Sequence, residues 1–106
     1  MFARKVFMHL KPNSVGGLIQ GLEREIIPLL RKQKGFQDEI TFVAPSGTEA
    51  FPISLWDRAE SAEAYNRASY AEVTKILATV VEGPPQVETF NVANSTFHKI
   101  AAAVAV

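Results

Sequence analysis

The stretch Gly35–Trp56 constrains the fold more than any other part of the chain, because it contains two strand-like segments around a turn. Residues 40–43 (ITFV) and 51–56 (FPISLW) are rich in β-branched and aromatic side chains, which favour strands. The five residues between them, APSGT, combine proline and glycine, which favour tight turns. The sequence therefore predicts a β-hairpin in the middle of the chain.

One strand and one helix are predicted before this hairpin. Phe2–Leu10 has apolar residues on both of its alternating sets, which is typical of a strand covered on both faces. A helix follows to about Lys34, with leucines and isoleucines at the three- and four-residue spacing of one helix face. Pro28 lies inside this pattern and is expected to kink the helix, because it removes one backbone hydrogen bond.

A second helix and a last strand are predicted after the hairpin. Asp57 and Glu60 have the spacing of a capping box, which places the start of a helix there. The apolar pattern continues to about Glu82, where Gly83-Pro84-Pro85 is expected to stop the helix. The final strand is predicted at Gln86–Ala93.

The resulting order, β-α-β-β-α-β, predicts an α+β fold of the ferredoxin-like class. It consists of a four-stranded antiparallel sheet with two helices on one face. Within the hairpin, Phe36, Ile40 and Phe42 share one alternating set and are expected on the same face. Because two helices cover only one face, the simplest cover for the other face is a second copy of the chain. We therefore expect a homodimer.

The 106 residues are expected to form one domain over residues 1–94, followed by a tail over 95–106. The tail ends in a run of alanines and valines, so we expect it to pack on the body or on the partner subunit.

Charge and composition exclude several classes of partner and chemistry. Eleven basic residues balance eleven acidic ones, which gives no reason to expect nucleic acid or an anionic membrane as a partner. The absence of cysteine excludes disulfides, thiolate metal sites and a cysteine nucleophile. The two histidines have no metal-ligand spacing, and no dinucleotide-binding pattern is present, so neither a metal nor a cofactor is predicted. No apolar run has membrane-spanning length, and we expect a cytoplasmic protein.

Two segments carry a resemblance to a known family. The sequence IIPLLRKQKGF, with proline inside the first helix, and the sequence SLWDRAESAEAY resemble the antibiotic biosynthesis monooxygenase domain. This domain is one branch of the dimeric α+β barrel superfamily, and the similarity covers about Lys5–Val92. The resemblance implies a homodimer whose sheets pack face to face. Members of this family include cofactor-free oxygenases of polycyclic phenols, haem-degrading oxygenases and proteins with no established activity, so the resemblance implies one of these.

The resemblance is uneven at the positions that carry the chemistry. Trp56 matches the tryptophan that closes the third strand, but Pro52 stands where the quinone-forming enzymes have asparagine. The positions that haem-degrading relatives use hold His9, Tyr65 and Lys75, and lysine is not an expected haem ligand.

The leading prediction is a monooxygenase that acts on a small aromatic or polyketide-like molecule. His9 and Asn91 are the predicted catalytic residues, as base and amide donor, and Trp56, Tyr65 and Phe42 are the predicted substrate contacts. Each has a structural alternative: a hydrogen-bonded histidine at a strand end, a solvent-facing asparagine, or an aromatic residue of the core or dimer interface. A non-catalytic dimer that binds an apolar ligand or a protein partner is the second interpretation.

Overall fold

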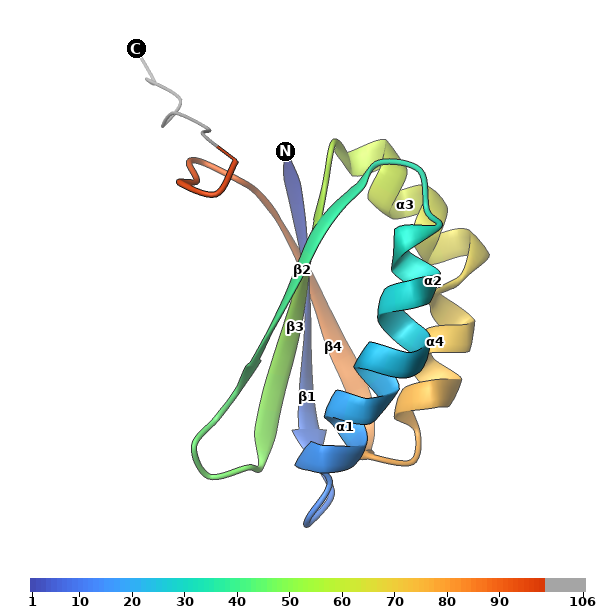
Figure 1. The fold of residues 1–106 in the computed structure, drawn as a ribbon, viewed down its shortest axis with the longest axis vertical. Helices are drawn as coiled ribbons and strands as arrows, with labels where there is room; N and C mark the ends of the chain where they lie inside the picture. The colour runs from blue at the N-terminus through green and yellow to red at the C-terminus, as the bar shows by residue number, and fades with distance from the viewer. Residues whose placement is uncertain (99–106) are drawn as a thin grey trace.

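The computed structural model describes residues 1–98, in which helices cover one face of a four-stranded antiparallel sheet (Figure 1). The strands stand in the order β2-β3-β1-β4, which is the order of the ferredoxin-like fold. The predicted fold class is therefore confirmed. The elements are β1 (Phe2–Leu10), α1 (Val15–Gly21), η1 (Leu22–Ile26), α2 (Ile27–Arg31), β2 (Phe36–Val43), β3 (Glu49–Trp56), α3 (Ala59–Ala68), α4 (Tyr70–Leu77) and β4 (Val81–Asn91).

The two faces of the sheet differ in what covers them. On β1, Val6, Met8 and Leu10 point under the helices and are buried. The largest fully buried side chains are Trp56, Met8 and Leu18, so the core lies between the sheet and the helices. Figure 1 shows the opposite face of the sheet without a covering helix. We call it the open face.

Large apolar side chains remain accessible on the open face. Ile40 and Phe42 on β2 are 43% and 45% exposed, and Phe90 on β4 is 48% exposed. Phe42 stacks on Phe51 of β3, with ring centroids 5.2 Å apart. The sheet thus carries apolar side chains on both faces, as predicted, and one of these faces has no covering helix.

A β-bulge corrects the predicted side-chain pattern of β2. Phe36 pairs with Trp56, whereas Asp38 pairs with Leu55, so the register shifts between Phe36 and Asp38. Phe36 therefore packs inward against the Trp56 ring, at 5.6 Å between centroids. Ile40 shares the open face with Phe42 instead of sharing a face with Phe36, because the bulge reverses the alternation.

The first helix absorbs Pro28 through a change of helix type. The segment η1 is a π-helical turn, in which the amide of Ile27 donates to the carbonyl of Leu22. Pro28 follows at the start of α2, where its missing N–H leaves the regular pattern least disturbed. The expected irregularity is therefore spread over the turn before the proline, and the helix ends at Arg31, three residues earlier than predicted.

The second half of the chain corrects three predicted boundaries. The helical region breaks at Ser69 and ends at Leu77, before the predicted Glu82. Gly83-Pro84-Pro85 lies inside β4 rather than stopping a helix. There Phe7 pairs with Gln86 and His9 pairs with Glu82, so three residues bulge opposite one, and Gly83 has a φ of 77°.

The prediction of a capping box at Asp57 and Glu60 is also wrong. The residue before α3 is Arg58, and no side chain caps the helix. The Asp57 carboxylate instead accepts hydrogen bonds from the Ser61 hydroxyl and the Arg58 amide, and these lower its pKa.

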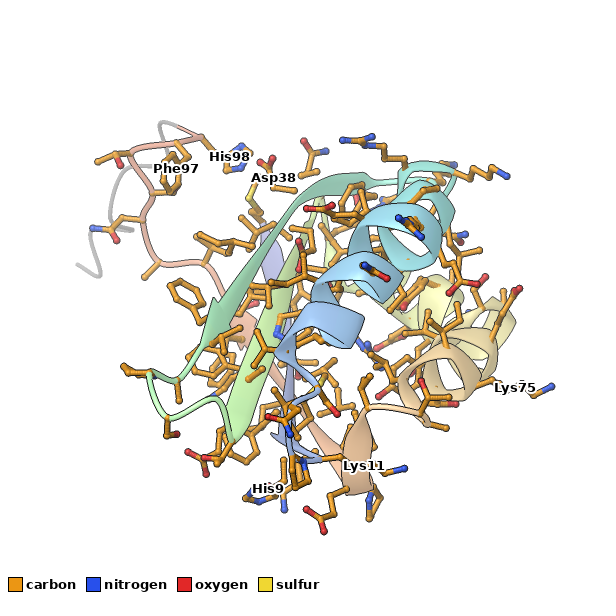
Figure 2. The ribbon with its side chains drawn as sticks, turned by 60° about the horizontal axis from the view of Figure 1, so that its bottom comes forward. His9, Lys11, Asp38, Lys75, Phe97 and His98 are labelled. Carbon is orange, nitrogen blue, oxygen red and sulfur yellow. The ribbon has the colours of Figure 1, made fainter. Side chains whose placement is uncertain are left out.

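The tail lies mostly outside the described residues. The side chain of His98 contacts the carboxylate of Asp38 on β2 (Figure 2). The predicted packing of the alanine- and valine-rich run falls on residues 99–106, about which the structure gives no description. Within residues 1–98, no helix has the length and apolar character needed to cross a bilayer.

Candidate functional site

A row of polar residues crosses the sheet beneath the helices. Glu39 on β2 pairs with Ser54 on β3, and Ser54 pairs with Arg4 on β1. Paired residues point to the same side of a sheet. Arg4 belongs to the same alternating set as the buried Val6, so the row faces the core. We call Glu39, Ser54 and Arg4 the polar row.

Arg4 is a buried cation that has no anionic partner among residues 1–98. Its side chain is only 4% exposed, and one guanidinium nitrogen donates to Oδ1 of Asn66 at 2.8 Å. The guanidinium carbon lies 4.0 Å from the ring centroid of Tyr70 and 5.4 Å from that of Tyr65. No carboxylate of residues 1–98 lies within 4 Å of it. Aromatic rings offset part of the cost of burying a charge, but an anion would offset more.

A cavity opens beside this arginine, between the sheet and the helices. Arg4, Ser54, Glu39, Tyr65 and Tyr70 contribute its polar groups. The cavity has a volume of about 30 Å³, which is space for about two water molecules. Its apolar wall consists of Val6, Leu22, Ile26, Leu30, Pro52, Val73 and Leu77.

Trp56 lies behind the cavity and positions two of its walls. The indole is fully buried and stacks on Tyr65, with ring centroids 5.1 Å apart and an interplanar angle of 29°. Its Nε1–H donates to the Ser54 hydroxyl at 2.9 Å. The Ser54 hydroxyl in turn lies 3.5 Å from the Arg4 carbonyl. Trp56 therefore fixes the orientation of Ser54 and Tyr65 without lining the cavity itself.

Two ionisable groups of the cavity have displaced pKa values. Burial raises the pKa of Tyr65 to about 12, against a smaller opposing effect of the Arg4 charge, so Tyr65 is a neutral hydrogen-bond donor at pH 7. Burial also raises the pKa of Glu39 above 4.5, while a hydrogen bond from the Thr41 hydroxyl acts in the opposite direction. Both shifts favour the neutral forms, as expected for groups removed from water.

The structure brings only part of the predicted site together. Tyr65 lines the cavity, and Trp56 stacks on the Tyr65 ring. His9 and Phe42 point to the open face. The His9 side chain is 61% exposed, with Nδ1 3.8 Å from a Glu49 carboxylate oxygen, at the end of β1 (Figure 2).

Asn91 lies at the opposite end of the sheet from His9. It pairs with Phe2, seven residues before His9 on β1, which corresponds to about 23 Å along the strand. Asn91 is exposed and lies outside the cavity. The two predicted catalytic residues therefore do not meet within one protomer.

The haem-related positions also lie apart. Lys75 points away from the body of the molecule (Figure 2), far from the end of β1 that carries His9. In residues 1–98, no three acidic or histidine side chains are arranged to hold a metal ion.

Sequence reasoning missed Arg4, Ser54 and Glu39. A signal existed for Arg4, because it precedes Val6 by two residues and so occupies a position of the buried set. A charged residue at a predicted core position is a strong indication of a site. For Glu39 no comparable signal existed, because its direction depends on the bulge in β2.

Comparisons with known proteins bear on the fold. No family model matches the sequence, and no curated protein matches it. Among solved structures, a monooxygenase from the ActVA-Orf6 gene of Streptomyces coelicolor, in complex with nanaomycin D, superimposes with a TM-score of 0.76 at 17% identity, over 89% of this chain and 88% of that chain. A protein proposed to be an antibiotic biosynthesis monooxygenase from Bordetella bronchiseptica gives a TM-score of 0.75 at 14% identity, over 86% and 95%.

A third structure, NE2512 from Nitrosomonas europaea, is of unknown function and gives a TM-score of 0.73 at 17% identity, over 90% of this chain and 91% of that chain. The chain therefore has the fold of the antibiotic biosynthesis monooxygenases, which confirms the resemblance at the level of the fold. At these identities the likeness carries no activity from those proteins to this one.

Proposed function

We propose that this protein is a cofactor-independent monooxygenase whose substrate is a small aromatic or enolic molecule with an ionisable oxygen. The observation that carries the proposal is the buried guanidinium of Arg4, which has no carboxylate of residues 1–98 within 4 Å and lies at a cavity with mostly apolar walls. The cavity has room for only about two water molecules, and Arg4 offers a fixed positive charge where a phenolate or enolate oxygen would form. The named activity of one protein with this fold supports the reaction type.

The proposed reaction needs no resident redox group. Loss of a proton from the substrate carbon leaves an electron-rich carbanion, whose charge is shared with the oxygen held by Arg4. This carbanion transfers electrons to dioxygen. In the overall conversion of a CH2 group to C=O, one oxygen atom enters the substrate and the other leaves as water with the two hydrogens. The four electrons gained by dioxygen all come from the substrate.

We propose further that the open face is the homodimer interface. Its accessible apolar side chains are Ile40 and Phe42 on β2 and Phe90 on β4, and no helix covers this face (Figure 1). Exposed apolar patches of this kind favour association. Pairing two such faces would remove them from water while leaving both cavities on the outer sides of the two sheets.

A non-catalytic binding protein is the second candidate, and the small volume of the cavity favours it. The cavity volume of about 30 Å³ is smaller than a polycyclic phenol requires. A ligand of that size could enter only if the helices moved away from the sheet. A binder and an oxygenase both need Arg4, but only the oxygenase consumes dioxygen.

The test uses Arg4→Met with Lys5→Met as the matched control. Lys5 is the next residue on β1 and points to the open face. Oxygen consumption is measured with anthrone and substituted hydroquinones in the presence of a chelator, and binding is followed by the fluorescence of Trp56. Arg4→Met is expected to lower kcat/KM by about 10²-fold or more, because it removes a preorganised positive charge, whereas Lys5→Met stays near wild type.

Wild-type protein that binds these compounds without consuming oxygen would establish the binding protein instead. If neither binding nor oxygen consumption occurs with any compound of the series, both candidates fail.

A further inference from the structure

Glu39 occupies the opposite end of the polar row from Arg4. One strand, β3, separates them, and strands lie about 4.8 Å apart, so the two backbones are about 10 Å apart. Both side chains line the cavity, yet they form no ion pair within 4 Å. The cavity therefore has a fixed cation at one end and a carboxyl group at the other, with space between them.

Glu39 also lines a second hollow, which opens on the outer surface between α2 and β2. Ile27 and Arg31 of α2 form one side of this hollow, and Asp38 and Glu39 of β2 form the other. Glu39 is the one residue of the inner cavity that also lines this hollow. The half-buried Glu39 thus stands between the interior cavity and the outer surface.

We infer that Glu39 is the general base that takes the proton from the substrate carbon and releases it to water in the hollow between α2 and β2. The inference rests on the proposed function, because it assigns a step of that reaction. The C–H bond breaks, its electron pair stays on the substrate as an enolate held by Arg4, and the proton forms an O–H bond with the Glu39 carboxylate. Proton loss from Glu39 to water restores the carboxylate for the next turnover.

The local environment suits this role. The Thr41 hydroxyl donates to a Glu39 carboxylate oxygen and orients the group. Burial raises the Glu39 pKa above 4.5, which makes its carboxylate a stronger base than an exposed one. The charged and titratable groups around it are Arg4 from β1, Tyr65 from α3, Tyr70 from α4, Arg31 from α2 and the neighbouring Asp38.

The pH dependence follows from the direction of the shift. Protonated Glu39 cannot accept a proton, so the rate falls as the pH drops through its raised pKa. The acid limb of the rate profile is therefore expected above pH 4.5. Tyr65 stays neutral through this range, because its pKa is about 12.

Hydrogen exchange measured without oxygen isolates this step. Anthrone, or the smaller 2-indanone, is incubated in D2O under anaerobic conditions with the protein, and deuterium entry at the acidic CH2 group is followed by NMR. Glu39→Gln is expected to reduce the protein-catalysed exchange and the aerobic oxygen uptake by about 10²-fold or more, because general bases contribute factors of this size. Binding measured by Trp56 fluorescence is expected to change less than about threefold.

Two further variants complete the experiment. Glu39→Asp keeps a carboxyl group and is expected to retain part of the exchange with its acid limb, which a purely structural role would not produce. Glu63→Gln, an exposed residue on α3 outside the cavity, is the matched control and stays at the wild-type rate.

The outcomes separate this inference from the proposed function. If wild-type protein consumes oxygen while Glu39→Gln keeps the wild-type exchange rate and acid limb, the assignment of Glu39 is overturned and the oxygenase stands. If wild-type protein catalyses neither exchange nor oxygen uptake, both are overturned.

Discussion

The two faces of the sheet distribute their polar groups in opposite ways. Beneath the helices, the polar row crosses the middle of an otherwise apolar face, with Arg4 at 4% exposure. On the open face the neighbouring cation, Lys5, is accessible and lies 3.8 Å from a carboxylate oxygen of Glu88 on β4, while His9 and Asp38 stand toward the ends of the strands. A charge in the middle of a buried face costs folding free energy and points to a ligand. A paired, accessible charge beside exposed apolar side chains such as Ile40 and Phe42 costs little and is compatible with a protein interface.

The two faces give different roles to Trp56 and Phe42, both of which the sequence predicts as substrate contacts. Trp56 on the inner face holds Ser54 and Tyr65 in place and belongs to the core. Phe42 on the open face, one of the predicted substrate contacts, stacks on Phe51 and remains 45% exposed. Substitutions on the two faces should therefore affect different properties.

The largest effect is expected for the association of two open faces. Phe42→Glu introduces a charge there, and a two-fold interface contains the change twice. We expect the dimer to weaken by about 10⁴-fold, or about 5.5 kcal/mol, because unpaired charges are costly to bury. Light scattering at micromolar concentration measures the mass. Val87→Glu is the control, because Val87 is similarly exposed at 41% but lies on the other face of β4. A wild-type monomer, or a Phe42→Glu dimer, contradicts the assignment of the open face.

Smaller effects are expected on the free energy of unfolding, and their sizes should differ between a core residue and a residue of the open face. In the Phe42→Glu background, Trp56→Ala is expected to lower the free energy of unfolding by about 4 kcal/mol, because it leaves a large cavity in the core. Phe51→Ala on the open face should cost about 1 kcal/mol in the same background, because its ring is only partly buried in a protomer. Urea unfolding followed by circular dichroism compares them, and equal losses would mean that the two faces do not differ as described.

The smallest effect concerns Glu39 and pH. A carboxyl group whose pKa is raised by folding binds its proton more tightly in the folded state, so it contributes most to stability below pH 4.5 and loses that contribution as the pH rises through the raised value. Glu39→Gln is therefore expected to be more stable than wild type at pH 7, by less than about 1 kcal/mol for this half-exposed group. Thermal melts at pH 4 and pH 7 measure the difference. A gain that persists unchanged at pH 4 would argue against burial as the cause of the shift.

Sequence patterns were sufficient for the fold because each element carries its own period. The alternation in Phe2–Leu10 and in the hairpin, and the helical spacing before Pro28, lead to the correct strand and helix types. The ends of the helices and strands were harder to predict where one sequence motif is compatible with two kinds of structure. Gly83-Pro84-Pro85 fits the end of a helix as well as a wide bulge in an edge strand, and the pairing with β1 decides between them.

The candidate site was less predictable, because it depends on register. A bulge of one residue in β2 turns Glu39 toward the cavity and Phe42 away from it. No local sequence pattern predicts the bulge between Phe36 and Asp38. Arg4 was accessible in principle, since its place in the buried alternation follows from Val6 and Met8 alone. The prediction of His9 and Asn91 relied on their chemistry without regard to the face or end of the sheet on which they lie.

The π-helical turn η1 has a geometric consequence for the roof of the cavity. Leu18, Leu22, Ile26 and Leu30 recur every four residues and are all at most 5% exposed. In a straight α-helix of 3.6 residues per turn, a four-residue repeat drifts by about 40° at each step, so the last leucine would have rotated about 120° away from the first. The wider turn at Leu22–Ile26 takes up this drift and keeps the stripe facing the sheet. The first helix thus carries one residue more than an α-helix of the same angular span, and the apolar roof over Arg4 depends on that additional residue.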